Sequence, residues 1–223
     1  MNLSVKSHLP NFLTCCNLAC GSVGIVQVFN NNIYIAIYLI WAALVFDFLD
    51  GFAARILGVH SPMGKELDSL ADMVTFGVLP GVIAYYLLSA NHESWWIPYL
   101  GFLITIFSAL RLAKFNIDEN QTDVFIGLPT PANTLFISSL VFVPAEWLTF
   151  ILLIILIFAF SYLLVAPIEM LALKFKHFRW KDNEFRYLII GLFIIGILVL
   201  QQLALPMIIL AYICLSIVKK AFF

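Results

Sequence analysis

The length of the apolar runs constrains this sequence more than any other feature. The chain of 223 residues divides almost without remainder into such runs, each close to the roughly 20 residues that an α-helix needs to cross a hydrocarbon layer about 30 Å thick. Hydrophobic residues make up 63% of the chain and charged residues 11%, whereas soluble domains have roughly 45–50% and about 25%. The sequence therefore predicts an all-α, polytopic transmembrane helix bundle and excludes a soluble protein.

Eight of the runs are long enough to be membrane spans. They cover residues 11–29, 33–57, 66–89, 95–115, 127–144, 147–173, 186–201 and 204–220. All 12 Lys and Arg residues fall at the N-terminus, in the even-numbered turns or at the C-terminus, and such charges mark the cytoplasmic side. We therefore expect one domain over residues 1–223, embedded in the cytoplasmic (inner) membrane, with both termini in the cytoplasm.

The charge balance limits the class of partner. The net charge is -1 and the basic residues are scattered along the chain, so no basic face for nucleic acid is expected. The expected partners are membrane lipid and a small molecule.

Four acids lie close together in the pattern, near the cytoplasmic ends of two neighbouring spans. Asp47 and Asp50 are three residues apart, and Asp68 and Asp72 are four apart, so each pair shares one helix face. A short turn makes the two helices antiparallel neighbours, so the pairs can face one another. Because four carboxylates in one pocket repel, a hard divalent cation with oxygen ligands is the natural compensation. Two Mg²⁺ or Mn²⁺ ions would balance the charge and suit a displacement at phosphorus.

Aspartates in a membrane span are also typical of an ion or proton pathway in a transporter. These acids cluster at one depth near the cytoplasmic surface instead of being distributed across the bilayer, which favours a metal site. Gly51 lies one turn from Asp47, and Ala54 is small on the same face. Both leave room for a substrate to approach the helix beside the metals.

The acids belong to a longer pattern, D-x2-D-G-x2-A-R-x8-G-x3-D-x3-D, which runs from Asp47 to Asp72. It is similar, without gap or substitution, to the signature of the CDP-alcohol phosphatidyltransferase family, membrane enzymes that join an alcohol to a phosphatidyl or similar group and release CMP. Residues 9–21, 111–116 and 127–132 resemble the phosphatidylserine synthase branch of that family. The branch usually has Arg where Lys114 stands, and Lys keeps the charge but lacks the planar fork of Arg.

The resemblance implies a role for each motif residue. Asp47, Asp50 and Asp68 are implied as ligands of a two-metal centre, with Asp72 near the metals and acting as the general base. Implied contacts of CDP-diacylglycerol are Gly51, Ala54, Arg55 and Gly64, with Ser69 and Asn17 as further candidates. The implied acceptor is L-serine, the implied products are phosphatidylserine and CMP, and the implied assembly is a homodimer.

Two of these candidates have a second interpretation. Ser69 lies between two motif acids and can contact the nucleotide, or it can bond its own helical turn. Asn17 lies on one stripe with Thr14 and Asn11, and polar groups on such a stripe bond either a neighbouring helix or a ligand.

Four further residues are candidates for binding the acceptor alcohol. Arg111 and Lys114 are three apart on one helix face, with Asn116 beside them, and they can grip a phosphate or the carboxylate of serine. Basic residues at this position also serve as ordinary topology signals. Thr130 can shape the amino-acid pocket, whereas its neighbour Pro129 can simply open a helix.

Two alternatives to serine transfer stay open. The alternative within the family is the same reaction with glycerol 3-phosphate or an inositol phosphate as the acceptor. These acceptors carry a phosphate and should require more cationic residues than Arg111 and Lys114 provide. Outside the family, the alternative is an ion-coupled transporter.

Overall fold

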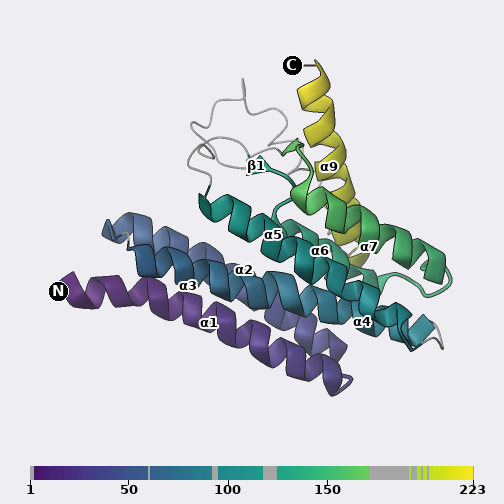
Figure 1. Cartoon of the computed structure of the whole chain (residues 1–223), viewed down its shortest axis with the longest axis horizontal. Helices are drawn as coiled ribbons and strands as arrows, with labels where there is room; N and C mark the ends of the chain where they lie inside the picture. Colours follow the sequence, from purple (N-terminus) through teal and green to yellow (C-terminus); the bar gives the residue numbers. More distant parts are fainter. Residues whose placement is uncertain are drawn as a thin grey trace.

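The protein is a bundle of helices in the computed structural model (Figure 1). The structure describes residues 3–59, 61–91, 95–117, 125–170, 191, 195–196, 198–199 and 201–222. The α-helices are α1 (Leu3–Phe29), α2 (Ile33–Leu57), α3 (Pro62–Asp72), α4 (Leu79–Asn91), α5 (Phe102–Ile117), α6 (Thr130–Ser139), α7 (Phe150–Val165) and α9 (Ala204–Phe222). A π-helix, η1 (Met73–Val78), joins α3 to α4, and short 3-10 helices are η2 (Ile97–Gly101), η3 (Leu140–Phe142) and η4 (Gln201–Leu203). Strands β1 (Phe125–Ile126) and β2 (Glu169–Met170) form one antiparallel pair.

Among the described residues, five helical stretches are long and apolar enough to cross a membrane. They are His8–Phe29, Ile33–Leu57, Pro62–Ala90, Ile97–Ile117 and Gln201–Val218. This confirms the predicted all-α membrane bundle, whereas the number of spans and the side of the termini stay predictions. The expected span 186–201 and the basic segment 174–186 lie largely outside the described residues.

The fifth and sixth expected spans are shorter in the structure than the apolar runs predicted. The helix expected over 127–144 begins only at Thr130, because Gly127 has a positive φ of 79° and Pro129 is extended. The helix expected over 147–173 ends at Val165, and the chain beyond it extends into β2. Apolar residues continue past the helix ends here because several of them, including Leu128, Ala166 and Met170, are buried in the connecting segments.

The turn between α2 and α3 reverses the chain and so places the two acidic pairs together. Gly58 ends α2 in the left-handed conformation, with φ 64°, which glycine adopts without steric cost. Ser61 begins α3 by accepting a hydrogen bond on its Oγ from the Gly64 N–H at 3.0 Å, and Pro62 follows in the first turn. Both caps are strong helix boundary signals.

Small residues let the helices approach closely around the middle of the bundle. A Cβ at Gly21 of α1 would collide with the Thr75 side chain of η1, and one at Gly101 would lie 2.5 Å from the Tyr85 backbone nitrogen. In lipid, such close packing supplies much of the attraction between helices. On the other side of the core, Phe136 of α6 stacks on Phe160 of α7 at 3.7 Å between ring centroids.

Candidate active site

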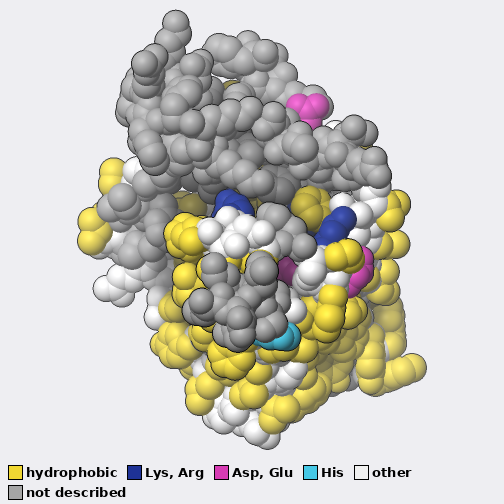
Figure 2. All heavy atoms as spheres, turned by 90° about the vertical axis from the view of Figure 1, so that its left-hand side faces the viewer, with side chains coloured by type: hydrophobic (Ala, Val, Ile, Leu, Met, Phe, Trp, Pro, Cys, Tyr) yellow, Lys and Arg dark blue, Asp and Glu magenta, His cyan; other side chains and the backbone are white. Residues whose placement is uncertain are grey.

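Acidic side chains from the C-terminal half of α2 and from α3 converge toward the end of the bundle where these two helices are joined. Asp47 and Asp50 of α2 and Asp68 of α3 each present a carboxylate oxygen, and these three oxygens lie within 4.8 Å of one another. Figure 2 looks at this end of the molecule, where acidic and basic side chains appear beside a broad hydrophobic flank. Asp50 is only 6% exposed, so water does little to screen its charge.

Asp72, the last residue of α3, joins the same cluster. Its carboxylate lies close enough to Asp47 and Asp68 for their charges to interact. Asn17 of α1 donates from Nδ2 to Asp72 Oδ1 at 3.2 Å. The structure thus brings together the four acids that the spacing placed on facing surfaces, while their roles as ligands and base stay predictions.

Helix α1 supports the cluster through a second polar side chain. The hydroxyl of Thr14 lies 2.6 Å from Asp50 Oδ2 and donates its proton to that carboxylate. Thr14 is 4% exposed and Asn17 is fully buried. The polar stripe on α1 therefore bonds acids of neighbouring helices. Thr14 was not among the predicted site residues, although its spacing from Asn17 had put it on that stripe.

A cavity of about 890 Å³ opens beside the acids, between α1, α2 and α3. Its lining residues are Pro10, Asn11, Thr14, Asp50, Gly51, Ala54, Arg55, Gly58, Val59, Ser61, Pro62, Gly64, Lys65 and Asp68. Gly51, Ala54, Arg55 and Gly64, the predicted contacts of CDP-diacylglycerol, all lie on this surface. The volume is within the range of about 300–1,000 Å³ that is usual for small-molecule sites.

Two cations of the described part of the chain border this cavity. Arg55 donates from Nε to the Gly51 carbonyl oxygen at 2.9 Å, which holds the base of its guanidinium along α2. Lys65 donates from Nζ to the Asn116 carbonyl oxygen at 2.9 Å. Sequence reasoning did not select Lys65, although it follows Gly64 directly in the motif. The cavity therefore presents both carboxylates and cations, as a site for a metal-bound phosphate ester requires.

Ser69 has a partner that neither of its two interpretations anticipated. Its hydroxyl donates to Asn116 Oδ1 at 3.0 Å, across 47 residues of sequence. Asn116 thus receives bonds from both Lys65 and Ser69. This pair of contacts joins α3, which carries two of the acids, to the end of α5.

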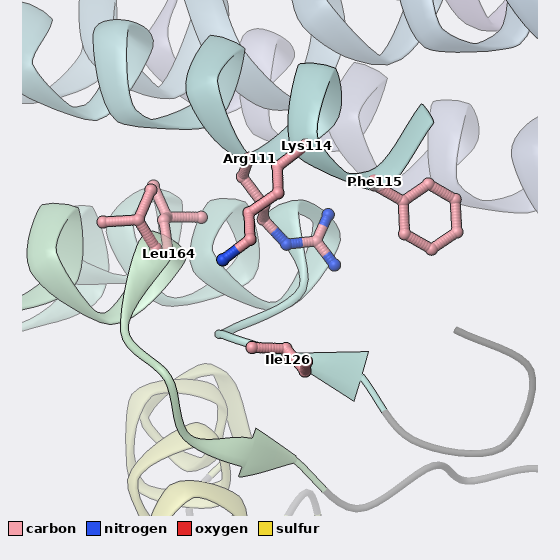
Figure 3. A pocket seen from close by; sticks show the side chains of 6 residues that line it. Arg111, Lys114, Phe115, Ile126 and Leu164 are labelled. Carbon is pink, nitrogen blue, oxygen red and sulfur yellow. The ribbon is translucent and has the colours of Figure 1, made fainter. Parts of the chain in front are cut away.

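Arg111 of α5 lies in a second, much smaller pocket of about 10 Å³. Its Nη1 donates to Thr130 Oγ1 at 3.4 Å, and the guanidinium carbon lies 5.9 Å from the centre of the Phe115 ring. Figure 3 shows Arg111 and Lys114 extending from α5 toward β1 and the end of α7. Arg111 is also close enough to Asp72 for their charges to interact. The predicted acceptor residues Arg111 and Thr130 are therefore in contact, and Arg111 interacts with one acid of the cluster.

The donor set is suited to a hard divalent cation. As far as the described residues go, the cluster offers carboxylate oxygens and neither sulfur nor imidazole, and oxygen is the ligand class that Mg²⁺, Mn²⁺ and Ca²⁺ prefer. The mutual repulsion of closely spaced carboxylates would be offset by such a cation. This geometry can hold a cation at the edge of a cavity that is large enough for a nucleotide.

Comparisons with known proteins point in the same direction. The family model for CDP-alcohol phosphatidyltransferase matches residues 7–171. The chain is 38% identical over 179 residues to a CDP-diacylglycerol–serine O-phosphatidyltransferase of Bacillus subtilis, an alignment that covers 78% of this chain and 92% of the relative. It is 39% identical over 125 residues to the protein of the same name from Helicobacter pylori, covering 55% and 52% of the two chains. It is 36% identical over 135 residues to an archaetidylserine synthase of Methanothermobacter thermautotrophicus, covering 59% and 56%.

Proposed function

The chain belongs to the CDP-alcohol phosphatidyltransferase family, and on this premise we propose that it transfers the phosphatidyl group of CDP-diacylglycerol to L-serine, giving phosphatidylserine and CMP. The observation that carries the proposal is the convergence of four aspartates beside a cavity lined by the rest of the motif. The names of the relatives support serine as the acceptor. The transporter interpretation has no support from these comparisons.

Asp47, Asp50 and Asp68 would hold the divalent cation, with Asp72 beside them. Their oxygen donors suit Mg²⁺ or Mn²⁺, and the number of acids suits two ions. When bound, such ions neutralise the pyrophosphate of the substrate and the charge that grows on the departing CMP.

Asp72 is the general base of the proposed reaction. The serine hydroxyl oxygen attacks the phosphorus that carries diacylglycerol, its proton passes to Asp72, and the bond from phosphorus to the CMP oxygen breaks with its electron pair on CMP. The hydrogen bond from Asn17 to Asp72 Oδ1 fixes the orientation of this carboxylate. A hydroxyl is a weak nucleophile, so a base positioned to remove its proton is needed to activate it.

The cavity receives the nucleotide and the pyrophosphate. Gly51, Ala54 and Gly64 present little side chain, which lets the substrate approach the helix backbones closely. Arg55 supplies a positive charge to the phosphates from the same wall. The two acyl chains remain in the lipid beside the bundle.

On the acceptor side, Arg111 pairs with the carboxylate of serine, and Thr130 orients the guanidinium. Lys114 adds a second positive charge near the pocket. Asn116 accepts hydrogen bonds from Lys65 and Ser69 and so ties the end of α5, which carries Arg111, to α3.

We further propose that the protein is a homodimer of one membrane-embedded domain, with the site at the cytoplasmic face of the inner membrane. The distribution of the 12 basic residues in the sequence supports this orientation. The family resemblance supports the dimer.

The test is CMP release by the purified protein from CDP-diacylglycerol and Mn²⁺, with L-serine, glycerol 3-phosphate and an inositol phosphate as parallel acceptors. We expect release with L-serine, and preference for a phosphorylated acceptor would refute the assignment. Asp72→Asn should lower kcat by about 10²–10⁴-fold, the usual contribution of a general base. Full turnover by Asp72→Asn would remove the base role from this residue.

A further inference from the structure

Buried polar atoms without a partner lie on three neighbouring helices, α5, α6 and α7. Among the described residues, six buried side-chain nitrogen or oxygen atoms have no hydrogen-bond partner, and five of them belong to Ser108, Arg111, Asn133 and Ser161. We call these four side chains the polar junction. Their exposed fractions are 0%, 8%, 0% and 2%. In Asn133 both the amide nitrogen and the amide oxygen lack a partner.

Helices α5 and α6 contact each other through Arg111 and Thr130. Ser108 precedes Arg111 by three residues on α5, and Asn133 follows Thr130 by three residues on α6. Because residues three apart share a helix face, Ser108 and Asn133 each lie one turn deeper in the bundle from this contact.

Helix α7 packs against α5 and α6 and carries Ser161, the fourth residue of the polar junction. Leu164, three residues after Ser161, lines the same pocket as Arg111 (Figure 3). Phe160, the residue before Ser161, stacks on Phe136 of α6. Ser161 is therefore on the part of α7 that packs against the other two helices.

Unpaired polar groups at this depth require an explanation, because most buried polar groups in folded proteins are paired. The four side chains offer a cation with an unpaired N–H, two hydroxyls, and an amide that both donates and accepts. This set complements a small α-amino acid, whose carboxylate needs a cationic donor and whose ammonium needs oxygen acceptors. Of the four, Arg111 alone is charged, which suits a neutral zwitterion better than a phosphate dianion.

We propose that the polar junction is the amino-acid subsite, in which Arg111 binds the carboxylate of the acceptor and Asn133 binds its ammonium group through Oδ1. This inference rests on the proposed function and adds Asn133, Ser108 and Ser161 to the residues that select the acceptor. The charges of Asp72 and Arg111 are close enough to interact, which puts the proposed subsite on the same side of the bundle as the base. The pocket at Arg111 has room for about one water molecule, so binding of the acceptor there requires movement of the side chains that line it, of which Lys114 is exposed.

Protein stability separates this role from a structural one. Replacing an unpaired buried polar group with an apolar group of similar shape is neutral or stabilising, whereas removing a paired group is destabilising. A binding group can therefore be lost with an unchanged or higher Tm, at the expense of affinity.

The experiment uses the full chain in detergent with CDP-diacylglycerol and Mn²⁺, and measures CMP release against L-serine concentration together with Tm. Asn133→Leu should raise the KM for serine by about 10-fold or more, because a hydrogen bond to a charged group is lost. The KM for CDP-diacylglycerol should stay unchanged, and the Tm should not fall. Ser161→Ala should also raise the KM for serine, by a smaller factor, and should leave the KM for CDP-diacylglycerol unchanged. Ser139→Ala is the matched control, since Ser139 is buried on α6 but its hydroxyl is paired with the Phe136 carbonyl at 2.7 Å.

An unchanged serine KM in both variants would overturn the inference and leave the junction with ordered water only. A lower Tm with equal losses for both substrates would also overturn it, because that result describes a structural role. If Asn133→Leu does not fold, Ser161→Ala decides the matter alone. Absence of serine-dependent CMP release from the unaltered protein would instead overturn the proposed function, and this inference with it.

Discussion

Thr14 connects α1 to the acidic cluster, and removal of its hydroxyl tests how the cluster is held in place. Thr14→Val keeps the shape of the side chain and deletes the oxygen that lies 2.6 Å from Asp50 Oδ2. Thr14 and Asp50 are 4% and 6% exposed, so bulk water has little access to replace the lost bond. Asp50 would then lose the contact that fixes its orientation toward Asp47 and Asp68.

The size of the effect follows from the type of bond. A hydrogen bond to a charged group contributes about 1.5–3 kcal/mol, which is a factor of about 10 to 150 if all of it appears in cation binding. Changing a residue that orients a metal ligand generally costs about 10–100-fold in metal affinity or activity. We therefore expect the half-saturating Mn²⁺ concentration of Thr14→Val to rise by about 10- to 100-fold.

The assay titrates CMP release with Mn²⁺ at saturating CDP-diacylglycerol and L-serine. Thr14→Ser restores the hydroxyl and should recover most of the cation affinity. Ser22→Ala is the control, because Ser22 is exposed on the same helix and its hydroxyl bonds its own turn at Leu18. An unchanged Mn²⁺ dependence in Thr14→Val, or an equal shift in Ser22→Ala, would refute the reasoning.

Three further results are expected. Ser69→Ala and Asn116→Ala should each lower kcat/KM, and the double variant should be less impaired than the sum of the single effects, because the two side chains share one bond; strict additivity would count against that link. Gly21→Val should lower the Tm in detergent, since its Cβ would collide with Thr75 and overpacking costs about 1–3 kcal/mol; an unchanged Tm would show that the helices can separate freely there. EDTA should abolish CMP release and added Mn²⁺ should restore it, whereas activity that survives EDTA would contradict a metal site.

The acidic cluster was predictable because the information for it is local. Spacings of three and four residues put each pair of acids on one helix face, and Gly58 and Pro62 signalled the reversal between the helices. The structure brings these acids together. Helix periodicity and a turn were sufficient for this part of the site.

Contacts between distant helices were not predictable in the same way. The spacing of Thr14 and Asn17 indicated a polar stripe on α1, but it did not indicate which helix the stripe would face. The bond between Ser69 and Asn116 depends on how α3 and α5 are rotated about their axes. Periodicity predicts which residues share a face of a helix, but it does not predict which helix packs against that face.

The π-helix after Asp72 was also outside the reach of sequence patterns. Its irregular hydrogen bonding goes with partners on other helices: Thr134 donates to the Phe76 carbonyl at 2.9 Å, and Thr105 donates to the Gly77 carbonyl at 3.1 Å. Such turns are frequent near functional sites. The stabilising hydroxyl groups lie 28 and 58 residues away in sequence. The local sequence therefore does not predict the change from α-helical to π-helical hydrogen bonding.

Buried polar groups of two kinds among the described residues have opposite consequences. The hydroxyl of Thr14 and the amide nitrogen of Asn17 are paired with acids and fix them, so loss of these bonds should weaken both the fold and the site. Asn133 and Ser161 have unpaired atoms in the described structure, so they reduce the stability of the free protein and become satisfied only when a polar ligand arrives. Stability and activity are therefore expected to fall together at Thr14, whereas at Asn133 an apolar replacement should preserve stability while serine affinity falls.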